Sequence, residues 1–222
     1  MTARHSVRQY LDKPIEEEKI KQLRDCIEEC NRMGNLHIQL VTDEPNAFSG
    51  GLAKYGKFSG ISNYIAMIGK KGDDVTLGYY GEQVVLLAQR LGLNTCWVGL
   101  TYSKQPDKYE VRPGEKLVCV VSLGYGATQG VQHPQKKGYE AYCKDARKEP
   151  SAFPKWFEDG MKAALLAPTA INQQKFEFVL HDGNRVEGKT RFTMLNGYAP
   201  IDLGIAKCHF EIGAGKESFE WV

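Results

Sequence analysis

The sequence predicts an α+β protein in which mixed β-sheets are flanked by helices. Apolar residues recur every three or four positions in some segments, as on a helix face, and alternate with polar residues in others, as on a strand. In addition, the order helix, strand, strand, helix, strand occurs twice. We therefore predict a single domain over residues 1–222, built of two quasi-repeats at about 1–135 and 150–222.

The first repeat is expected to begin with a helix near Pro14. Proline fits the first turn of a helix, and Glu16–Glu18 suit the positive end of the helix dipole. This helix should end at 31–35, and a second helix should run over 81–91. Strands are expected at 36–41, 63–69, 95–100 and 116–124. The last of these strands is almost wholly apolar, so it should lie inside its sheet.

The second repeat follows a loop at 124–138 that is rich in glycine and polar residues. Helices are expected over 156–165 and over 202–215, the second ending at a glycine. Strands are expected at 175–180, 191–195 and 218–222, with a turn at 181–184.

Length and composition exclude several classes of protein. Charged residues make up 25% of the chain and the apolar content is ordinary, which argues against a disordered or fibrous chain. The net charge of +2 argues against a dedicated nucleic-acid binder. No apolar run approaches the roughly 20 residues of a membrane-spanning helix, and the N-terminal sequence lacks the apolar stretch of a secretory signal.

The six cysteines contain no CxxC pair: Cys26, Cys30, Cys96, Cys119, Cys143 and Cys208. We therefore expect free thiols, no structural disulfide and a reducing, cytoplasmic location. A zinc site is not expected, because the H-x-E of His209 and Glu211 has no PCxxC to accompany it. His209 is expected on a helix face.

The glycine-rich run at 123–130 fails as a dinucleotide-binding motif. Its spacing is GxGxxxG instead of GxGxxG, and Pro134 and two lysines follow in place of a helix. The sequence also lacks the GxSxG elbow and the P-loop.

The first candidate site is RHSVRQY, Arg4–Tyr10, which precedes the first predicted helix. In an extended backbone Arg4, Ser6 and Arg8 would point the same way. Two guanidinium groups and a hydroxyl on one face suit a phosphate group, because arginine presents forked donors to an oxyanion. Taken alone, the pattern favours a solvated basic arm over a phosphate site.

The second candidate is LLAPTAINQQKFEF, Leu165–Phe178, where a predicted helix stops at Pro168. The amides of Asn172 and Gln174 can donate and accept hydrogen bonds at once, as a flat heteroaromatic ring with carbonyl and N–H edges requires. A turn at the helix end is the alternative, and it is the better interpretation of this stretch alone.

The third candidate is GLNTCWVGLTY, residues 92–102. Gly99 would let the backbone approach a planar ligand closely. Packing of Trp97 in the core is the more common reason for such a run.

Taken together, RHSVRQYLDKPI, LAPTAINQQKFEFVL, GEQVVLLAQRLGLNTCWVG and VVSLGYG resemble the FMN-dependent nitroreductase family. The R-[RH]-S-x-[RK] arm and the A-P-[ST]-x-x-N-x-Q segment before a strand are each fairly specific, and their co-occurrence is much more so. The resemblance touches most of the chain. It implies a nitroreductase-like fold and a bound FMN.

The resemblance assigns residues to the cofactor. Four would hold the ribityl phosphate, one of them (His5) through its backbone: Arg4, His5, Ser6 and Arg8. Four would line the isoalloxazine ring: Pro168, Thr169, Ala170 and Asn172. The backbone at Val98 and Gly99 would face the ring near its reactive N5, and further phosphate-binding cations would be Lys136 and Lys137. No catalytic side chain and no metal ligand is expected.

The order of these motifs departs from the family pattern, in which the arm, the first helix and the P-[ST]-x-x-N segment follow one another. Here the first helix runs into EECNRMGNLHIQL, and P-T-x-x-N ends the first helix of the second repeat. Ordinary family members are homodimers with FMN between the subunits. The chain therefore resembles such a dimer fused into one chain, which implies a monomer with one flavin; a homodimer is the alternative.

The implied activity is hydride transfer from NADH or NADPH through flavin N5 to an electron-poor acceptor, such as a nitroaromatic or a quinone. The expected partner is this small molecule, with no nucleic acid and no membrane. The alternative is a flavin-binding protein whose reductase activity is lost or specialised. A structural module without a cofactor stays open as well.

Overall fold

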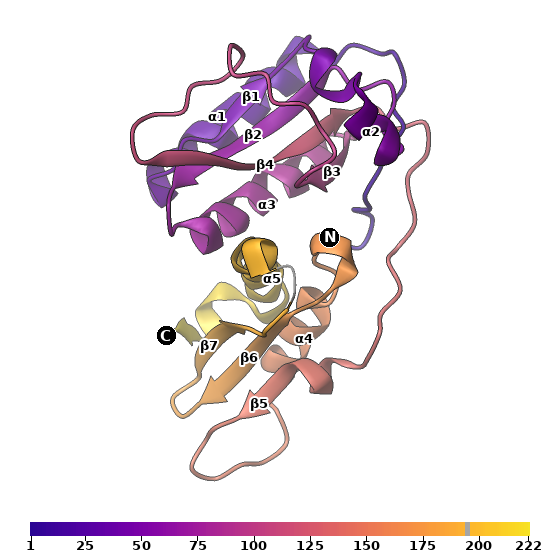
Figure 1. The fold of residues 1–222 in the computed structure, drawn as a ribbon. Helices are drawn as coiled ribbons and strands as arrows, with labels where there is room; N and C mark the ends of the chain where they lie inside the picture. Colours follow the sequence, from indigo (N-terminus) through magenta and orange to yellow (C-terminus); the bar gives the residue numbers. More distant parts are fainter. Residues whose placement is uncertain (194–195) are drawn as a thin grey trace. The chain divides into compact units, whose positions relative to one another are not determined.

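Two sheets organise the chain, each within its own unit (Figure 1). The computed structural model describes residues 1–193 and 196–222. These residues divide into a first unit, Ala3–Gln132, and a second unit, His133–Val222 together with Met1–Thr2. Each unit combines a four-stranded sheet with helices in its described residues, so the predicted α+β class is confirmed. The internal duplication stays a prediction.

The first unit follows the order α1 (Glu17–Gly34), β1 (Gln39–Val41), η1 (Asn46–Phe48), α2 (Gly51–Tyr55), β2 (Asn63–Lys70), α3 (Asp74–Arg90), β3 (Asn94–Val98) and β4 (Glu115–Gly124). Its strand order is β1-β2-β4-β3, and each neighbouring pair is antiparallel. β4 has a partner on both sides, which confirms its predicted interior position. α3 packs against α1, β2 and β3, so its apolar residues are buried in the core.

α1 begins later than the sequence predicts and ends within the predicted range of 31–35. Its first helical residue is Glu17, so Pro14 lies outside the helix. The helix continues to Gly34 and ends at Asn35, whose φ of 50° is left-handed. Asn31 does not end the helix, because its side chain bonds to a later part of the chain instead of to the helix backbone.

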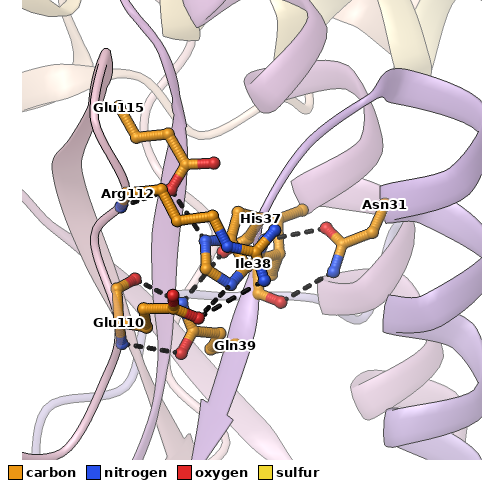
Figure 2. A network of polar contacts seen from close by, with 7 residues as sticks. All are labelled: Asn31, His37, Ile38, Gln39, Glu110, Arg112 and Glu115. Atoms are coloured by element: carbon orange, nitrogen blue, oxygen red, sulfur yellow. Dashed lines mark hydrogen bonds and ion pairs between the residues drawn. The ribbon is translucent and has the colours of Figure 1, made fainter.

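β1 is shorter than predicted, and the backbone of Ile38 just before it bonds to the side chain of Asn31 (Figure 2). Asn31 Nδ2 donates to the Ile38 carbonyl over 2.9 Å, and the Ile38 N–H donates to Asn31 Oδ1 over 2.7 Å. The side chain of Gln39 exchanges a similar pair of bonds with the backbone of Glu110, at 2.7 and 3.0 Å. The ladder with β2 starts at Gln39, and before it the His37 N–H still donates to the Ile68 carbonyl over 3.0 Å.

The second unit follows the order η2 (Tyr139–Tyr142), β5 (Cys143–Asp145), α4 (Lys155–Ala164), η3 (Ala170–Asn172), β6 (Phe176–His181), β7 (Arg185–Thr190), η4 (Asn196–Tyr198), α5 (Ala199–Ala214), η5 (Lys216–Ser218) and β8 (Glu220–Trp221). Its strand order is β5-β6-β7-β8. The outer pairs are parallel and the central pair β6/β7 is antiparallel, so this sheet is mixed.

The predicted strand at 191–195 is wrong for its described part. Residues 191–193 have no regular secondary structure, and 194–195 lie outside the described residues. The chain instead turns after His181 and returns at once as β7, which pairs with β6 from Arg185 to Thr190. The pattern missed β7 because its sequence, RVEGKT, is polar and only Val186 among its residues is buried.

Two helices start earlier than predicted. α3 begins at Asp74 instead of Gly81, and α5 begins at Ala199 instead of Asp202. Each additional segment contributes residues to the core: Leu77 is 0% exposed in α3, and Ala199 and Ile201 are each 3% exposed in α5. In α3, tertiary packing therefore outweighs the weak helix propensity of Gly78.

α4 and α5 approach each other closely at Gly213. A Cβ atom there would lie 2.5 Å from the Cβ of Ala163 and 2.6 Å from the carbonyl oxygen of Asp159. Gly213→Ala is therefore expected to lower the free energy of unfolding by about 1–3 kcal/mol, despite the higher helix propensity of alanine. Urea denaturation measures this change. Gly51→Ala is the control, because a Cβ there meets nothing within 4 Å; equal stability of the two variants would contradict the prediction.

Candidate functional site

The arm, Arg4–Tyr10, is an extended segment of the first unit. The Val7 N–H donates to the Thr95 carbonyl in β3 over 3.0 Å, and the Tyr10 N–H donates to the Ser59 carbonyl over 3.0 Å. The side chains of Val7 and Tyr10 are buried in the core. The arm is thus fixed at two points, and the side chains between them project from a defined backbone.

Arg4 is 3% exposed and lies beside Glu82 of α3. Arg4 Nε is 3.7 Å from Glu82 Oε1, and the indole N–H of Trp97 donates to Glu82 Oε2 over 2.9 Å. Arg4 Nε and Nη1 have no hydrogen-bond partner among the described residues. Buried donors normally have partners, so these N–H groups suit an acceptor from outside the chain.

Arg4, Ser6 and Arg8 differ in exposure but gather around one thiol. Arg4 is buried, whereas Ser6 and Arg8 are exposed. All three act on Cys96 in β3. Burial raises the pKa of the Cys96 thiol, and the charges of Arg8 and Arg4 and the hydroxyl of Ser6 oppose this rise. The structure therefore brings together the three side chains that the sequence assigns to a phosphate.

The cofactor residues that lie neither among the three just described nor in the segment 165–178 vary in exposure. His5 is half-buried in the arm. Val98 is the buried last residue of β3, and Gly99 follows it half-buried. Lys136 and Lys137 belong to the second unit and are exposed in the segment before η2.

The Pro168 loop, residues 168–174, joins α4 to β6 in a strained conformation. Ile171, Asn172 and Gln174 have φ values of 48°, 53° and 47°. This left-handed region is uncommon for non-glycine residues, and for a β-branched residue such as isoleucine it is an outlier. Each such residue costs on the order of 1–3 kcal/mol, and this kind of strain clusters at ligand-binding sites. The loop must therefore be held by its surroundings.

Asp202, in the first turn of α5, holds the start of the loop. The Ala170 N–H donates to both carboxylate oxygens, at 3.0 and 3.1 Å. Gln173 Nε2 donates to Asp202 Oδ2 over 2.7 Å, and the Thr193 hydroxyl donates to Gln173 Oε1 over 2.6 Å. Asp202 is 3% exposed, so water does not compete for its oxygens.

A second set of side chains holds the end of the loop. The Gln174 N–H donates to Thr169 Oγ1 over 3.0 Å. The Gln174 side chain donates to the Leu165 carbonyl over 3.2 Å and accepts from the Tyr142 hydroxyl over 3.2 Å. The Gln174 amide thus bonds within its own unit, and its contact with a flat ligand stays a prediction.

Asn172 keeps one polar atom without a partner. Its Nδ2 donates to the Pro134 carbonyl over 3.0 Å. Its Oδ1 is buried and has no hydrogen-bond partner within the described part of the chain. A buried unpaired acceptor costs about 1–3 kcal/mol, so this atom indicates a place for a ligand donor. Among the neighbours assigned to the ring, Pro168 is buried and the next two residues, 169–170, are half-buried.

Burial raises the pKa of Asp202 to about 6, against the opposing hydrogen bonds from Gln173 and Ala170. The folded pKa thus lies above the unfolded one of about 3.9. The group therefore stabilises the fold fully below the unfolded pKa, and this contribution is lost as the pH rises through about 6. At neutral pH the ionised carboxylate is retained at a cost in stability.

Glu82 and Asp202 were not predicted as site residues. Each is an acidic side chain on a helix whose other residues are mostly apolar, and each is buried. An acid in an apolar helical run was the available signal, because a buried carboxylate needs partners.

No metal site or membrane span is found in residues 1–193 and 196–222. These residues contain no group of three or more His, Cys, Asp or Glu side chains arranged for a metal ion. His209 is buried in α5, with Nδ1 3.2 Å from the Ala163 carbonyl oxygen. None of the six cysteines forms a disulfide within these described residues. No helix in the same ranges is both long and apolar enough to cross a bilayer.

Comparison with solved structures gives a clear similarity of fold. The structure described as "a putative nitroreductase" from Thermotoga maritima has a TM-score of 0.62 at 19% identity, over 98% of this chain and 83% of that chain. An FMN-dependent nitroreductase from Clostridium difficile has a TM-score of 0.46 at 18% identity, over 62% of this chain and 92% of that chain. The second likeness is too weak to support a conclusion.

Comparison with protein families covers nearly the whole chain. The family described as "Putative TM nitroreductase" matches residues 1–214. No curated protein matches the chain. The Thermotoga maritima structure confirms the nitroreductase-like fold that the sequence predicts. The chain therefore belongs to the "Putative TM nitroreductase" family, a nitroreductase family of oxidoreductases.

Proposed function

We propose that this chain is an FMN-dependent oxidoreductase that takes hydride from NADH or NADPH and passes it to an electron-poor acceptor, such as a nitroaromatic or a quinone. One observation carries the proposal: two buried polar groups without partners belong to residues that the nitroreductase pattern assigns to FMN. They are Arg4 Nε and Nη1, which are donors that lack a hydrogen-bond acceptor although Arg4 lies beside Glu82, and Asn172 Oδ1, an acceptor. FMN offers an anionic phosphate to the first and a ring N–H to the second.

In this proposal the protein binds and orients FMN, which supplies the hydride chemistry at its N5. Arg4 and Arg8 hold the phosphate through charge-assisted hydrogen bonds, and Ser6 adds a hydroxyl. His5 contributes its backbone. The Pro168 loop would line the ring, and Asn172 Oδ1 would accept from a ring N–H.

Further residues complete the proposed site. The backbone at Val98 and Gly99 would face the ring near N5, since glycine lets a planar ligand approach the backbone closely. Lys136 and Lys137 add positive charge for the phosphate. No side chain transfers a proton in this scheme, so the acceptor is selected by the shape and charge of the site.

We also propose that the chain binds one FMN as a monomer. The sequence contains one arm and one Pro168 loop, whereas a homodimer of ordinary family members supplies two of each. Light scattering and a flavin count on the purified protein test this. A monomer with one flavin per chain is expected, and two flavins per chain would refute the proposal.

The activity is tested on the purified protein under anaerobic conditions. We expect a yellow protein whose visible flavin absorbance is lost with NADH or NADPH and restored by a quinone or a nitroaromatic. Bound flavin that neither nucleotide reduces would favour a flavin-binding protein without reductase activity. A protein that is colourless and does not bind added FMN would refute the whole proposal.

Arg8→Ala is expected to weaken FMN binding by about 1.5–3 kcal/mol, or roughly 10- to 150-fold, the range for a hydrogen bond to a charged group. Quenching of FMN fluorescence on titration measures the dissociation constant. Arg24→Ala is the control, because Arg24 is exposed on α1 and has no assigned role. An unchanged dissociation constant for Arg8→Ala would show that the FMN phosphate does not bind at Arg8.

A further inference from the structure

We propose that Asp202 is a positioning residue, whose carboxylate holds the Pro168 loop in the conformation that presents Asn172 to the flavin ring. This inference rests on the proposed function and deepens it. Asp202 is not among the residues that the nitroreductase pattern assigns to FMN. It acts through the loop and does not need to contact the cofactor.

Asp202 accepts hydrogen bonds from residues on both sides of Asn172 in the sequence. The carboxylate accepts the N–H of Ala170, two residues before Asn172, and the side-chain N–H of Gln173, directly after it. The residues between these two anchors, Ile171 and Asn172, are both left-handed. Because the strained pair is fixed on both sides, the direction of the unpaired Asn172 Oδ1 depends on Asp202 as well as on the bond from Asn172 Nδ2 to the Pro134 carbonyl.

A carboxylate suits this role because it accepts from both donors at once. An amide at position 202 would keep the bond to the Ala170 N–H, but its NH2 group would face the NH2 group of Gln173. Gln173 could turn over and bond again, since the Thr193 hydroxyl accepts as well as donates. Asp202→Asn should therefore hold the loop in part, whereas Asp202→Ala should release it.

No cation compensates the buried carboxylate of Asp202 within the described residues. Burial raises its pKa, and the two hydrogen-bond donors are the opposing groups. Charged side chains on α5 and on the elements that pack against it are engaged elsewhere: Lys155 with Asp159, Lys162 with Glu158, Lys144 and Arg191 with Glu177, His181 and Lys189 with Glu187, and Lys207 with the Trp221 ring. This carboxylate lowers the stability of the fold and pairs with no cation. Its hydrogen bonds to the Pro168 loop explain why it is present.

The test compares wild type, Asp202→Ala and Asp202→Asn, with Asp107→Asn as an exposed control. In cofactor-free protein, amide hydrogen exchange at Ala170 is expected to be about 10- to 100-fold faster in Asp202→Ala, because its acceptor is gone. The FMN dissociation constant should rise by a similar factor in Asp202→Ala, with Asp202→Asn between it and wild type. The control should match wild type in both measurements.

A pH series separates the local role from a general loss of stability. As the pH falls through about 6, Asp202 becomes neutral, and its protonated oxygen is a poorer acceptor. Protection of the Ala170 amide, corrected for the intrinsic exchange rate, should then decrease in wild type and stay level in Asp202→Asn. The contribution of Asp202 to global stability changes in the opposite direction, since protonation removes a buried charge.

The outcomes distinguish this inference from the proposed function. If wild type binds no FMN, the proposed function fails, and the positioning role in flavin binding fails with it, even where exchange at Ala170 shows that Asp202 holds the loop. If wild type binds FMN and a folded Asp202→Ala binds it equally well, the positioning role is overturned and the proposed function stands. If Asp202→Ala does not fold, wild type and Asp202→Asn decide the question. Equal exchange at the Ala170 amide and the same pH profile of its protection in these two proteins would overturn the positioning role.

Discussion

Glu82→Ala is expected to lower the free energy of unfolding by about 3–5 kcal/mol, the usual result of removing one partner of a buried ion pair. Arg4 and Glu82 are almost fully buried, so the substitution leaves the guanidinium without an opposite charge. The indole N–H of Trp97 loses its acceptor as well. Both losses affect α3 and β3, two elements that contact the arm.

Denaturant unfolding followed by tryptophan fluorescence measures the effect of Glu82→Ala. Glu28→Ala is the matched control, because Glu28 is exposed on α1. Glu82→Gln should lie between wild type and Glu82→Ala, since an amide oxygen can still accept from Trp97 but carries no charge. A loss of less than about 1 kcal/mol in Glu82→Ala, typical of an exposed pair, would show that Arg4 has another partner.

Phe210→Ala is expected to cost about 3–5 kcal/mol in the second unit, the range for removing a buried phenylalanine ring. Phe210 is fully buried at the centre of an aromatic cluster. Its ring stacks on Phe178 at 4.9 Å and meets Phe157, Phe219 and Trp221 edge-on or tilted at 5.5, 5.2 and 5.5 Å. The cluster joins α4, β6 and β8 to α5, so a cavity there weakens the whole unit.

Thermal and urea unfolding measure the effect of Phe210→Ala, with Phe192→Ala as the control. Phe192 is 83% exposed and has little to lose on truncation. Phe210→Leu should recover part of the loss, since it fills most of the same volume. A Phe210→Ala variant as stable as Phe192→Ala would contradict the packing described for α5.

The strands that sequence patterns predicted best are the buried ones. β2, β4 and β6 lie within one residue of their predicted bounds, because runs of apolar or alternating residues mark them directly. β5 was missed because three residues carry too little pattern, and β7 because its sequence is polar. Their positions are set by pairing with β6, a contact between strands that a local pattern does not contain.

The candidate site divides in the same way. The arm and the Pro168 loop could be predicted, because each is a short motif whose residues are adjacent in the sequence. Their anchors could not, since Glu82 and Asp202 are distant in the chain from the residues they hold. The left-handed residues of the loop were also unpredictable, because Ile171 has no intrinsic preference for that conformation.

The arm also has a consequence for association between molecules. β3 is at the edge of its sheet and pairs on one side with β4, so the backbone groups of its other side would be open to another strand. The arm covers part of that edge, through the parallel bridge of Ser6 with Thr95 and the hydrogen bond from the Val7 N–H. The arm, part of which we assign to a phosphate, thus also protects this strand from intermolecular β-pairing. Losing the arm would therefore favour aggregation.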